Sequence, residues 1–101
     1  MTGDDIRNKI TQLRMERNLS EYDLSLQLGQ SKGYIQGITS GRSLPSMNML
    51  LNICEYFGIE VSEFFETKIP SPAIRELRRE IDGLADEDVV HLIHIVKKMK
   101  E

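Results

Sequence analysis

The chain has 101 residues, of which 40% are hydrophobic and 29% are charged, and its formal net charge at pH 7 is −3. This length allows one small hydrophobic core and excludes two independent ones, and no apolar run is long enough to span a membrane. The negative charge argues against a protein that coats nucleic acid regardless of sequence, although it leaves room for a local basic patch.

The N-terminus and the cysteine content bear on cellular location. The first residues include Asp4 and Asp5 and no apolar segment, so they match neither a secretory signal nor a transit peptide. We therefore expect a cytosolic, cytoplasmic protein. The single cysteine, Cys54, has no partner for a disulfide or a zinc site and is expected to pack as a small apolar residue.

Helical periodicity dominates the N-terminal part of the chain. A first helix is predicted over residues 4–17 and a second, short helix over residues 21–28, with Ser20 as the N-cap of the second. Gly29 suits the left-handed conformation that ends a helix. Because Ser31 is predicted to cap a third helix only two residues later, the chain must turn tightly between the second and third helices.

Two further helices are predicted before the first proline-rich break. The third helix is expected to end at Gly41, and Ser46 is predicted to cap a fourth helix that ends at Gly58. The apolar positions of the fourth helix have the spacing of a core-facing stripe and are Met47, Leu50, Leu51, Cys54 and Phe57. The residues expected to seal the core from a short fifth helix are Ile59, Val61, Phe64 and Phe65.

The segment TKIPSP predicts a boundary between residues 1–67 and residues 68–101. After it, Ser71 followed by Pro72 predicts a helix start. Two helices with matching apolar spacing follow, with Ile74, Leu77, Ile81 and Leu84 in the first and Val89, Leu92, Val96 and Met99 in the second. The sequence therefore predicts an all-α chain, in which a five-helix domain precedes a C-terminal two-helix hairpin.

The hairpin has too few apolar residues to form a core alone. Two arrangements stay open: the hairpin packs on a second copy of the chain, or it folds back onto residues 1–67. We expect the first, a homodimer through the C-terminal helices, because the N-terminal helices already have a complete set of apolar faces. The charges of the last helix favour its dipole at both ends and belong to Asp86, Glu87 and Asp88 and to Lys97, Lys98 and Lys100.

Two short helices joined by a glycine turn, the second with a polar face, form a helix-turn-helix pattern. The segment LRMERNLSEYDLSLQLGQSKGYIQGITSGRSLPSMNMLLNICEYFGIEVSEFF resembles the repressor-like helix-turn-helix domain of the phage-repressor/Cro family, also called the XRE family. The matching positions keep one register and are Leu13, Arg14, Leu19, Ser20, Leu24, Leu28, Gly29, Ser31, Ile35, Gly41, Pro45, Ser46, Leu50, Gly58, Ile59, Phe64 and Phe65.

The resemblance implies a sequence-specific transcriptional regulator whose recognition helix, residues 31–40, lies in the major groove of double-stranded DNA. It places Lys32 at a base-facing position, Gln36 near the backbone or base edges, and Arg42 at a phosphate. Lysine can donate to guanine, and glutamine can pair with adenine. The candidate DNA-binding residues are Ser20, Glu21, Ser31, Lys32, Gly33, Tyr34, Gln36, Gly37 and Arg42.

Three features depart from the family pattern. Glu21 stands where the family usually has a glutamine that contacts a phosphate, and Thr39 stands where many members have a glutamate that pairs with the arginine matching Arg14. Gly33 and Gly37 remove two side chains from the reading face. Two interpretations stay open: the glycines let DNA approach the helix backbone closely, or the chain is a degenerate helix-turn-helix module that binds proteins and no DNA.

The sequence offers little for catalysis. It has no Ser/His/Asp or Cys/His arrangement and no phosphate-binding glycine loop, so we expect neither an enzyme nor a cofactor. His91 and His94 are three residues apart on one helix, yet no further ligand is apparent. We interpret them as part of a solvated helix face rather than as a metal site.

Overall fold

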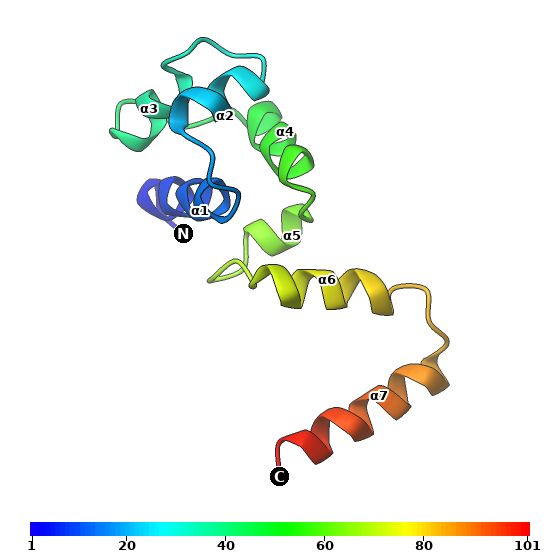
Figure 1. The fold of residues 1–101 in the computed structure, drawn as a ribbon. Helices are drawn as coiled ribbons and strands as arrows, with labels where there is room; N and C mark the ends of the chain where they lie inside the picture. Colours follow the sequence, from blue (N-terminus) through cyan, green and yellow to red (C-terminus); the bar gives the residue numbers. More distant parts are fainter. The chain divides into compact units, whose positions relative to one another are not determined.

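The computed structural model describes all residues from 1 to 101 and contains helices and no strands (Figure 1). The predicted all-α class is confirmed. The helices are α1 (Gly3–Glu16), α2 (Glu21–Gln27), α3 (Tyr34–Thr39), α4 (Met47–Phe57), α5 (Val61–Phe64), α6 (Pro72–Ile81) and α7 (Asp86–Met99). None of them is long and apolar enough to cross a membrane.

The chain divides into two compact units, residues 1–69 and residues 70–101. The first unit contains α1 to α5 and the hydrophobic core, and the second contains α6 and α7. Ile69, the last residue of the first unit, is buried in that core. An N-terminal fragment therefore has to include Ile69 to keep the core complete.

The core of the first unit is built from residues on every one of its helices. Its fully buried large side chains are Ile10, Leu13, Leu24, Ile35, Ile38, Ile53 and Phe64. On α4 the predicted stripe was partly wrong: Met47 and Leu51 are exposed, whereas Ile53 is buried. The buried residues of α4 are Leu50, Ile53, Cys54 and Phe57, which keep the i, i+3, i+4, i+7 spacing of one helix face, and Leu51 lies beside that face.

Three predicted serine N-caps are confirmed. The hydroxyl of Ser20 accepts a hydrogen bond from the Asp23 amide, that of Ser46 from the Met49 amide, and that of Ser71 from the Ile74 amide. These bonds satisfy amide groups that have no partner inside their own helix.

Left-handed glycines end α2 and α4. Gly29 has φ +71° and Gly58 has φ +65°, a region that residues with a side chain rarely adopt. The tight turn between α2 and α3 depends on the first of these, as the sequence predicted.

The short helix α5 differs from its prediction in what it buries. Val61 and Phe65 are exposed, so only Phe64 and the preceding Ile59 seal the core. The carboxylate of Glu63 accepts a hydrogen bond from the Glu60 amide at the helix start. Four residues form a single turn, so only one of its apolar side chains, that of Phe64, is buried in the core.

A lysine stabilises the C-terminal end of α5 from another helix. The Lys9 ammonium group, nearly buried, donates to the Phe64 carbonyl at 2.6 Å and to the Glu66 carbonyl. It also lies 5.7 Å from the centroid of the Phe64 ring. A cation at this position compensates the partial negative charge of the helix end.

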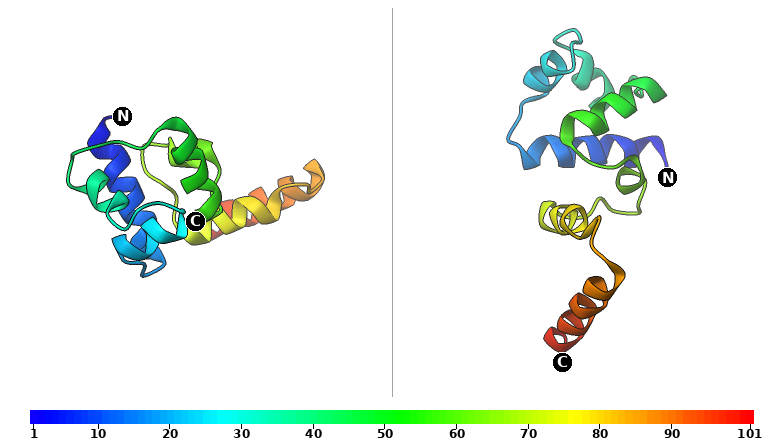
Figure 2. Two further views of the ribbon diagram at one scale, coloured as in Figure 1. Left: turned by 90° about the horizontal axis from the view of Figure 1, so that it is seen from above. Right: turned by 90° about the vertical axis from the view of Figure 1, so that its right-hand side faces the viewer.

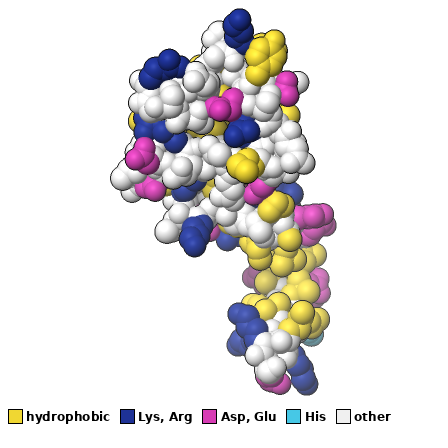
Figure 3. All heavy atoms as spheres, turned by 60° about the vertical axis from the view of Figure 1, so that its left-hand side comes forward, with side chains coloured by type: hydrophobic (Ala, Val, Ile, Leu, Met, Phe, Trp, Pro, Cys, Tyr) yellow, Lys and Arg dark blue, Asp and Glu magenta, His cyan; other side chains and the backbone are white.

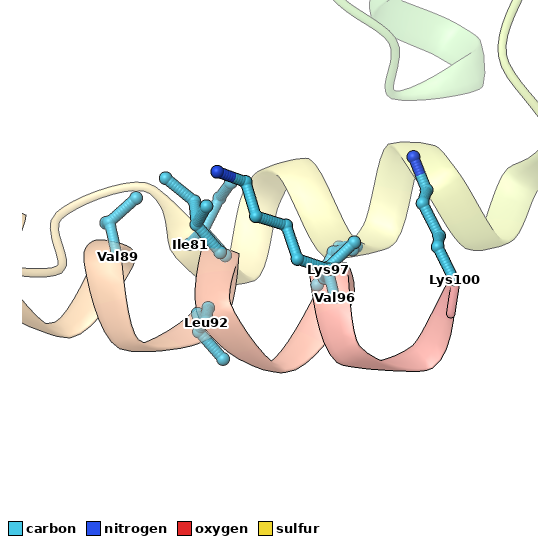
Figure 4. Close-up of a pocket in the computed structure, with 8 residues that line it drawn as sticks. Ile81, Val89, Leu92, Val96, Lys97 and Lys100 are labelled. Atoms are coloured by element: carbon cyan, nitrogen blue, oxygen red, sulfur yellow. The ribbon is translucent and has the colours of Figure 1, made fainter.

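The second unit is a pair of helices with little buried side-chain surface. No residue of α7 is buried, and Leu77, Leu92, Val96 and Met99 are all exposed. An open groove between the helices has an apolar lining that includes Ile81 from α6 and Val89 and Val96 from α7 (Figure 4). In the space-filling view, hydrophobic side chains gather over this unit (Figure 3).

Candidate nucleic-acid interface

Helices α2 and α3 lie side by side in the first unit, joined by the turn at Gly29 (Figures 1 and 2). Leu24 of α2 and Ile35 and Ile38 of α3 are completely buried. Because these apolar residues hold α3 by one face, the opposite face is left to solvent. The arrangement is that of a helix-turn-helix, with α3 in the place of the recognition helix.

The third helix is shorter than predicted. It begins at Tyr34, and Ser31 does not cap it; the N-cap is Gly33, which has no side chain to accept a hydrogen bond. Residues 31–33 instead form a turn, in which the Tyr34 amide donates to the Ser31 carbonyl at 3.0 Å. Lys32 and Gly33 therefore lie in the turn before α3.

Ser25 of α2 supplies the acceptor that the N-cap of α3 lacks. Its completely buried hydroxyl accepts from the Ile35 amide at 3.0 Å and donates to the Glu21 carbonyl at 2.7 Å. This bond fixes the start of α3 against α2. Sequence reasoning missed Ser25, because a serine four residues after Glu21 on a short helix has the pattern of an exposed polar position.

The exposed side of α3 and the loops at its two ends carry hydrogen-bonding and cationic side chains. Lys32, Gln36 and Arg42 are all exposed. The Arg42 guanidinium donates to the Gln36 side-chain oxygen at 2.7 Å, so these two side chains act together. Because arginine has donors only, the amide oxygen of Gln36 must face Arg42, and the amide NH₂ group is directed elsewhere.

The structure brings together two of the positions that depart from the family pattern. The Thr39 hydroxyl of α3 donates to the carboxylate of Glu21 at the start of α2. The Thr39 hydroxyl oxygen also lies 3.3 Å from the Ile35 carbonyl oxygen of the same helix. The carboxylate of Glu21 is therefore bound to α3. Sequence separation concealed this contact, because the two residues are 18 positions apart.

Arg14 has a partner other than an acidic side chain. One of its terminal nitrogens donates to the Leu19 carbonyl at 2.8 Å, in the loop between α1 and α2. Its Nε atom is buried and has no hydrogen-bond partner in the chain. The guanidinium group thus holds the loop in place of the ion pair that is usual in the family.

A second arginine, which sequence reasoning missed, holds the C-terminal end of α3. Arg7 of α1 donates from Nε to the Ile38 carbonyl at 2.9 Å and reaches the Gly41 carbonyl at 3.4 Å. Asp4 accepts from the same guanidinium at 2.8 Å. A cation at a helix C-terminus is favourable, and α3 is thereby fixed at both ends, by Ser25 and by Arg7.

Two other candidate residues have structural roles. The Ser20 hydroxyl caps α2 through the Asp23 amide. Tyr34 packs partly against the core, and burial raises the pKa of its hydroxyl above the usual value. Its ring is therefore shared between the core and the surface beside α3. Burial also raises the pKa of the Cys54 thiol, which keeps this group protonated and unreactive.

Neither Gly33 nor Gly37 is required by packing inside the protein. A Cβ atom at Gly33 would meet no atom within 4 Å, and one at Gly37 would lie 3.7 Å from the Ser43 hydroxyl, an ordinary contact. Gly37 lies within α3, where glycine costs about 1 kcal/mol relative to alanine. The reason for these glycines has to be sought outside the chain's own contacts.

Comparison with known proteins gives two results. A family model described as "Helix-turn-helix" matches residues 10–64, which include all of α2 and α3. The chain is also 32% identical over 60 residues to an uncharacterized HTH-type transcriptional regulator of Methanocaldococcus jannaschii. That match covers 59% of this chain and 91% of the archaeal protein.

Proposed function

The chain belongs to the XRE family of helix-turn-helix DNA-binding regulators, and we propose that it recognises a specific operator sequence through α3 and the turn before it. The observation that carries this proposal is the solvent-facing side of α3. Gln36 lies there, Lys32 lies in the turn before α3 and Arg42 in the loop after it, and the helix between them is fixed at both ends by buried or half-buried hydrogen bonds. The proposed role is binding rather than catalysis.

Gln36 and Arg42 have different proposed roles at the DNA surface: Gln36 contacts a base and Arg42 contacts the phosphate backbone. Arg42 supplies positive charge to the phosphate backbone, which positions the protein without reading sequence. Its bond to the Gln36 oxygen turns the amide NH₂ group outward. A glutamine held in this way offers donors alone, so it suits the acceptors of guanine and thymine better than the bidentate pairing with adenine.

Glu21 is compatible with this proposal, because Thr39 holds its carboxylate in one place. An acid at the start of α2 repels a phosphate most strongly when it is free to point at the phosphate. The hydrogen bond holds it against α3 instead. The carboxylate keeps its negative charge in this hydrogen bond, so it lowers the affinity for DNA without abolishing binding.

We propose in addition that the protein binds its operator as a homodimer held by α6 and α7. The exposed apolar side chains of the second unit support this proposal, since monomeric proteins rarely leave such a surface uncovered. Two copies would offer two recognition helices for half-sites one DNA turn apart. Sedimentation equilibrium on the full chain tests it, and a monomer at tens of micromolar would contradict it.

The operator proposal is tested by selecting duplexes from a random pool and measuring affinity for the selected sequence. Lys32→Ala should weaken binding and change the base preference. Arg42→Ala should weaken binding, flatten the salt dependence by about one unit, and change the base preference only at the position that Gln36 reads, because it frees the Gln36 amide. Lys68→Ala is the matched control, because Lys68 is exposed near the end of the first unit. If no sequence is enriched, or if all three variants bind alike, the assignment of α3 is wrong.

A further inference from the structure

The second unit carries clusters of opposite charge at the two ends of α7. The first turn of α7 holds Asp86, Glu87 and Asp88, and its last turn and C-cap hold Lys97, Lys98 and Lys100. None of these six side chains forms an ion pair within the chain. Between the two charged ends lies the exposed apolar surface of the same helix.

We propose that two copies of the chain associate through α7 in antiparallel orientation, a geometry that specifies and rests on the homodimer proposed above. The argument is charge complementarity. In an antiparallel pair, the acidic start of one α7 lies beside the lysine-rich end of the other, and this happens twice because the interface has two-fold symmetry. A parallel pair would instead place acids beside acids and lysines beside lysines.

The apolar residues fit the same arrangement. The midpoint of α7, Asp86–Met99, falls between Leu92 and Ile93, both of which are exposed. Around a two-fold axis at that point, Leu92 of one copy lies opposite Ile93 of the second. Val89 lies opposite Val96 in the same way, so apolar residues meet apolar residues along the helix.

The groove between α6 and α7 provides room for the second copy. It is lined by Leu77 and Ile81 from α6 and by apolar residues of α7, and Lys97 and Lys100 extend along its edge (Figure 4). An open apolar groove edged by lysine side chains accepts an apolar helix that carries acids at one end. The antiparallel α7 of a second copy is such a helix.

Disulfide trapping tests the orientation in the full-length protein. Cys54, the native cysteine, is buried, so an introduced cysteine is the reactive thiol. Leu92→Cys, next to the axis, should form a disulfide-linked dimer, whereas Met99→Cys, at the end of α7, should not link to itself. A mixture of Val89→Cys and Val96→Cys should yield the mixed dimer in preference to either self-linked one.

Charge reversal gives an independent readout that does not depend on disulfide geometry. The triple variant Lys97→Glu, Lys98→Glu, Lys100→Glu should self-associate about tenfold or more weakly than the wild type, as should the variant Asp86→Lys, Glu87→Lys, Asp88→Lys. Mixing the two should restore wild-type affinity. Circular dichroism checks that each variant keeps its helix content.

The outcomes separate the orientation from the dimer itself. Efficient self-linking of Met99→Cys, or a mixed pair that binds more tightly than the wild type, would indicate a parallel pair and overturn the orientation alone. Dimers that charge reversal leaves unchanged would place the interface elsewhere. A wild type that stays monomeric at tens of micromolar would overturn both the orientation and the homodimer.

Discussion

The two units of the chain use the same apolar spacing to different ends. In residues 1–69, Ile10, Ile35 and Phe64 are completely buried, whereas no residue of α7 is buried at all. Both sets of helices are amphipathic, so periodicity alone does not tell them apart. Spacing along the chain therefore predicts which face of a helix is apolar. The number of neighbouring helices decides whether that face is buried.

The largest loss of stability is expected when a buried side chain is removed from the first unit. Phe64→Ala should lower the free energy of unfolding by about 3–5 kcal/mol, because it leaves a cavity and takes the ring away from Lys9. The next residue, Phe65, is 42% exposed, and Phe65→Ala should cost about 1 kcal/mol. Urea denaturation of the full chain, followed by circular dichroism, measures both. Equal losses would contradict the assignment of Phe64 to the core.

A buried hydrogen bond gives the next largest expected effect. Ser25→Ala removes the acceptor of the Ile35 amide and leaves that buried group without a partner, which should cost about 1–3 kcal/mol. Ser40→Ala is the matched control, because the exposed Ser40 hydroxyl contacts only the Gly37 carbonyl of its own helix. The same denaturation measurement compares them. If both variants lose equally little, Ser25 does not fix the start of α3.

Much of this fold could be predicted because its signals are local. The caps at Ser20, Ser46 and Ser71 and the glycine turn at Gly29 each depend on residues within three or four positions. Such hydrogen bonds form whenever the helix forms, regardless of what lies across the core. The caps and the turn predicted from local sequence are therefore found in the structure.

Long-range contacts were the part that the sequence did not reveal. Ser25 caps α3 from another helix, and Arg7 binds the other end of α3 from 31 residues away. The bond between Thr39 and Glu21 likewise joins two helices. Because each requires the packed arrangement of α1, α2 and α3 before the partners meet, spacing along the chain gives no signal of it. Ser31 was predicted as a cap for that reason: its local pattern fits, and the competing acceptor on α2 is not visible in the sequence.

A smaller effect is expected where the first unit meets solvent. Glu21→Gln should raise affinity for the selected operator about three- to tenfold, because it removes a negative charge from the start of α2. The new amide oxygen still accepts the hydrogen bond from Thr39, so the arrangement of α2 and α3 is kept. Asp23→Asn removes the same charge two residues further along α2 and is the control. An equal gain in both variants would indicate a general charge effect rather than a phosphate beside residue 21.

The smallest expected change in stability separates the two interpretations of the glycines. Gly37 lies inside α3 and a methyl group fits there, so Gly37→Ala should stabilise the protein by about 0.5–1 kcal/mol. If DNA approaches the backbone at Gly37, the same methyl group should weaken operator binding, which fluorescence anisotropy measures. A more stable protein that binds less well would show that the glycine serves the contact with DNA. A variant that gains stability and keeps its affinity would contradict close approach of DNA to the backbone at Gly37.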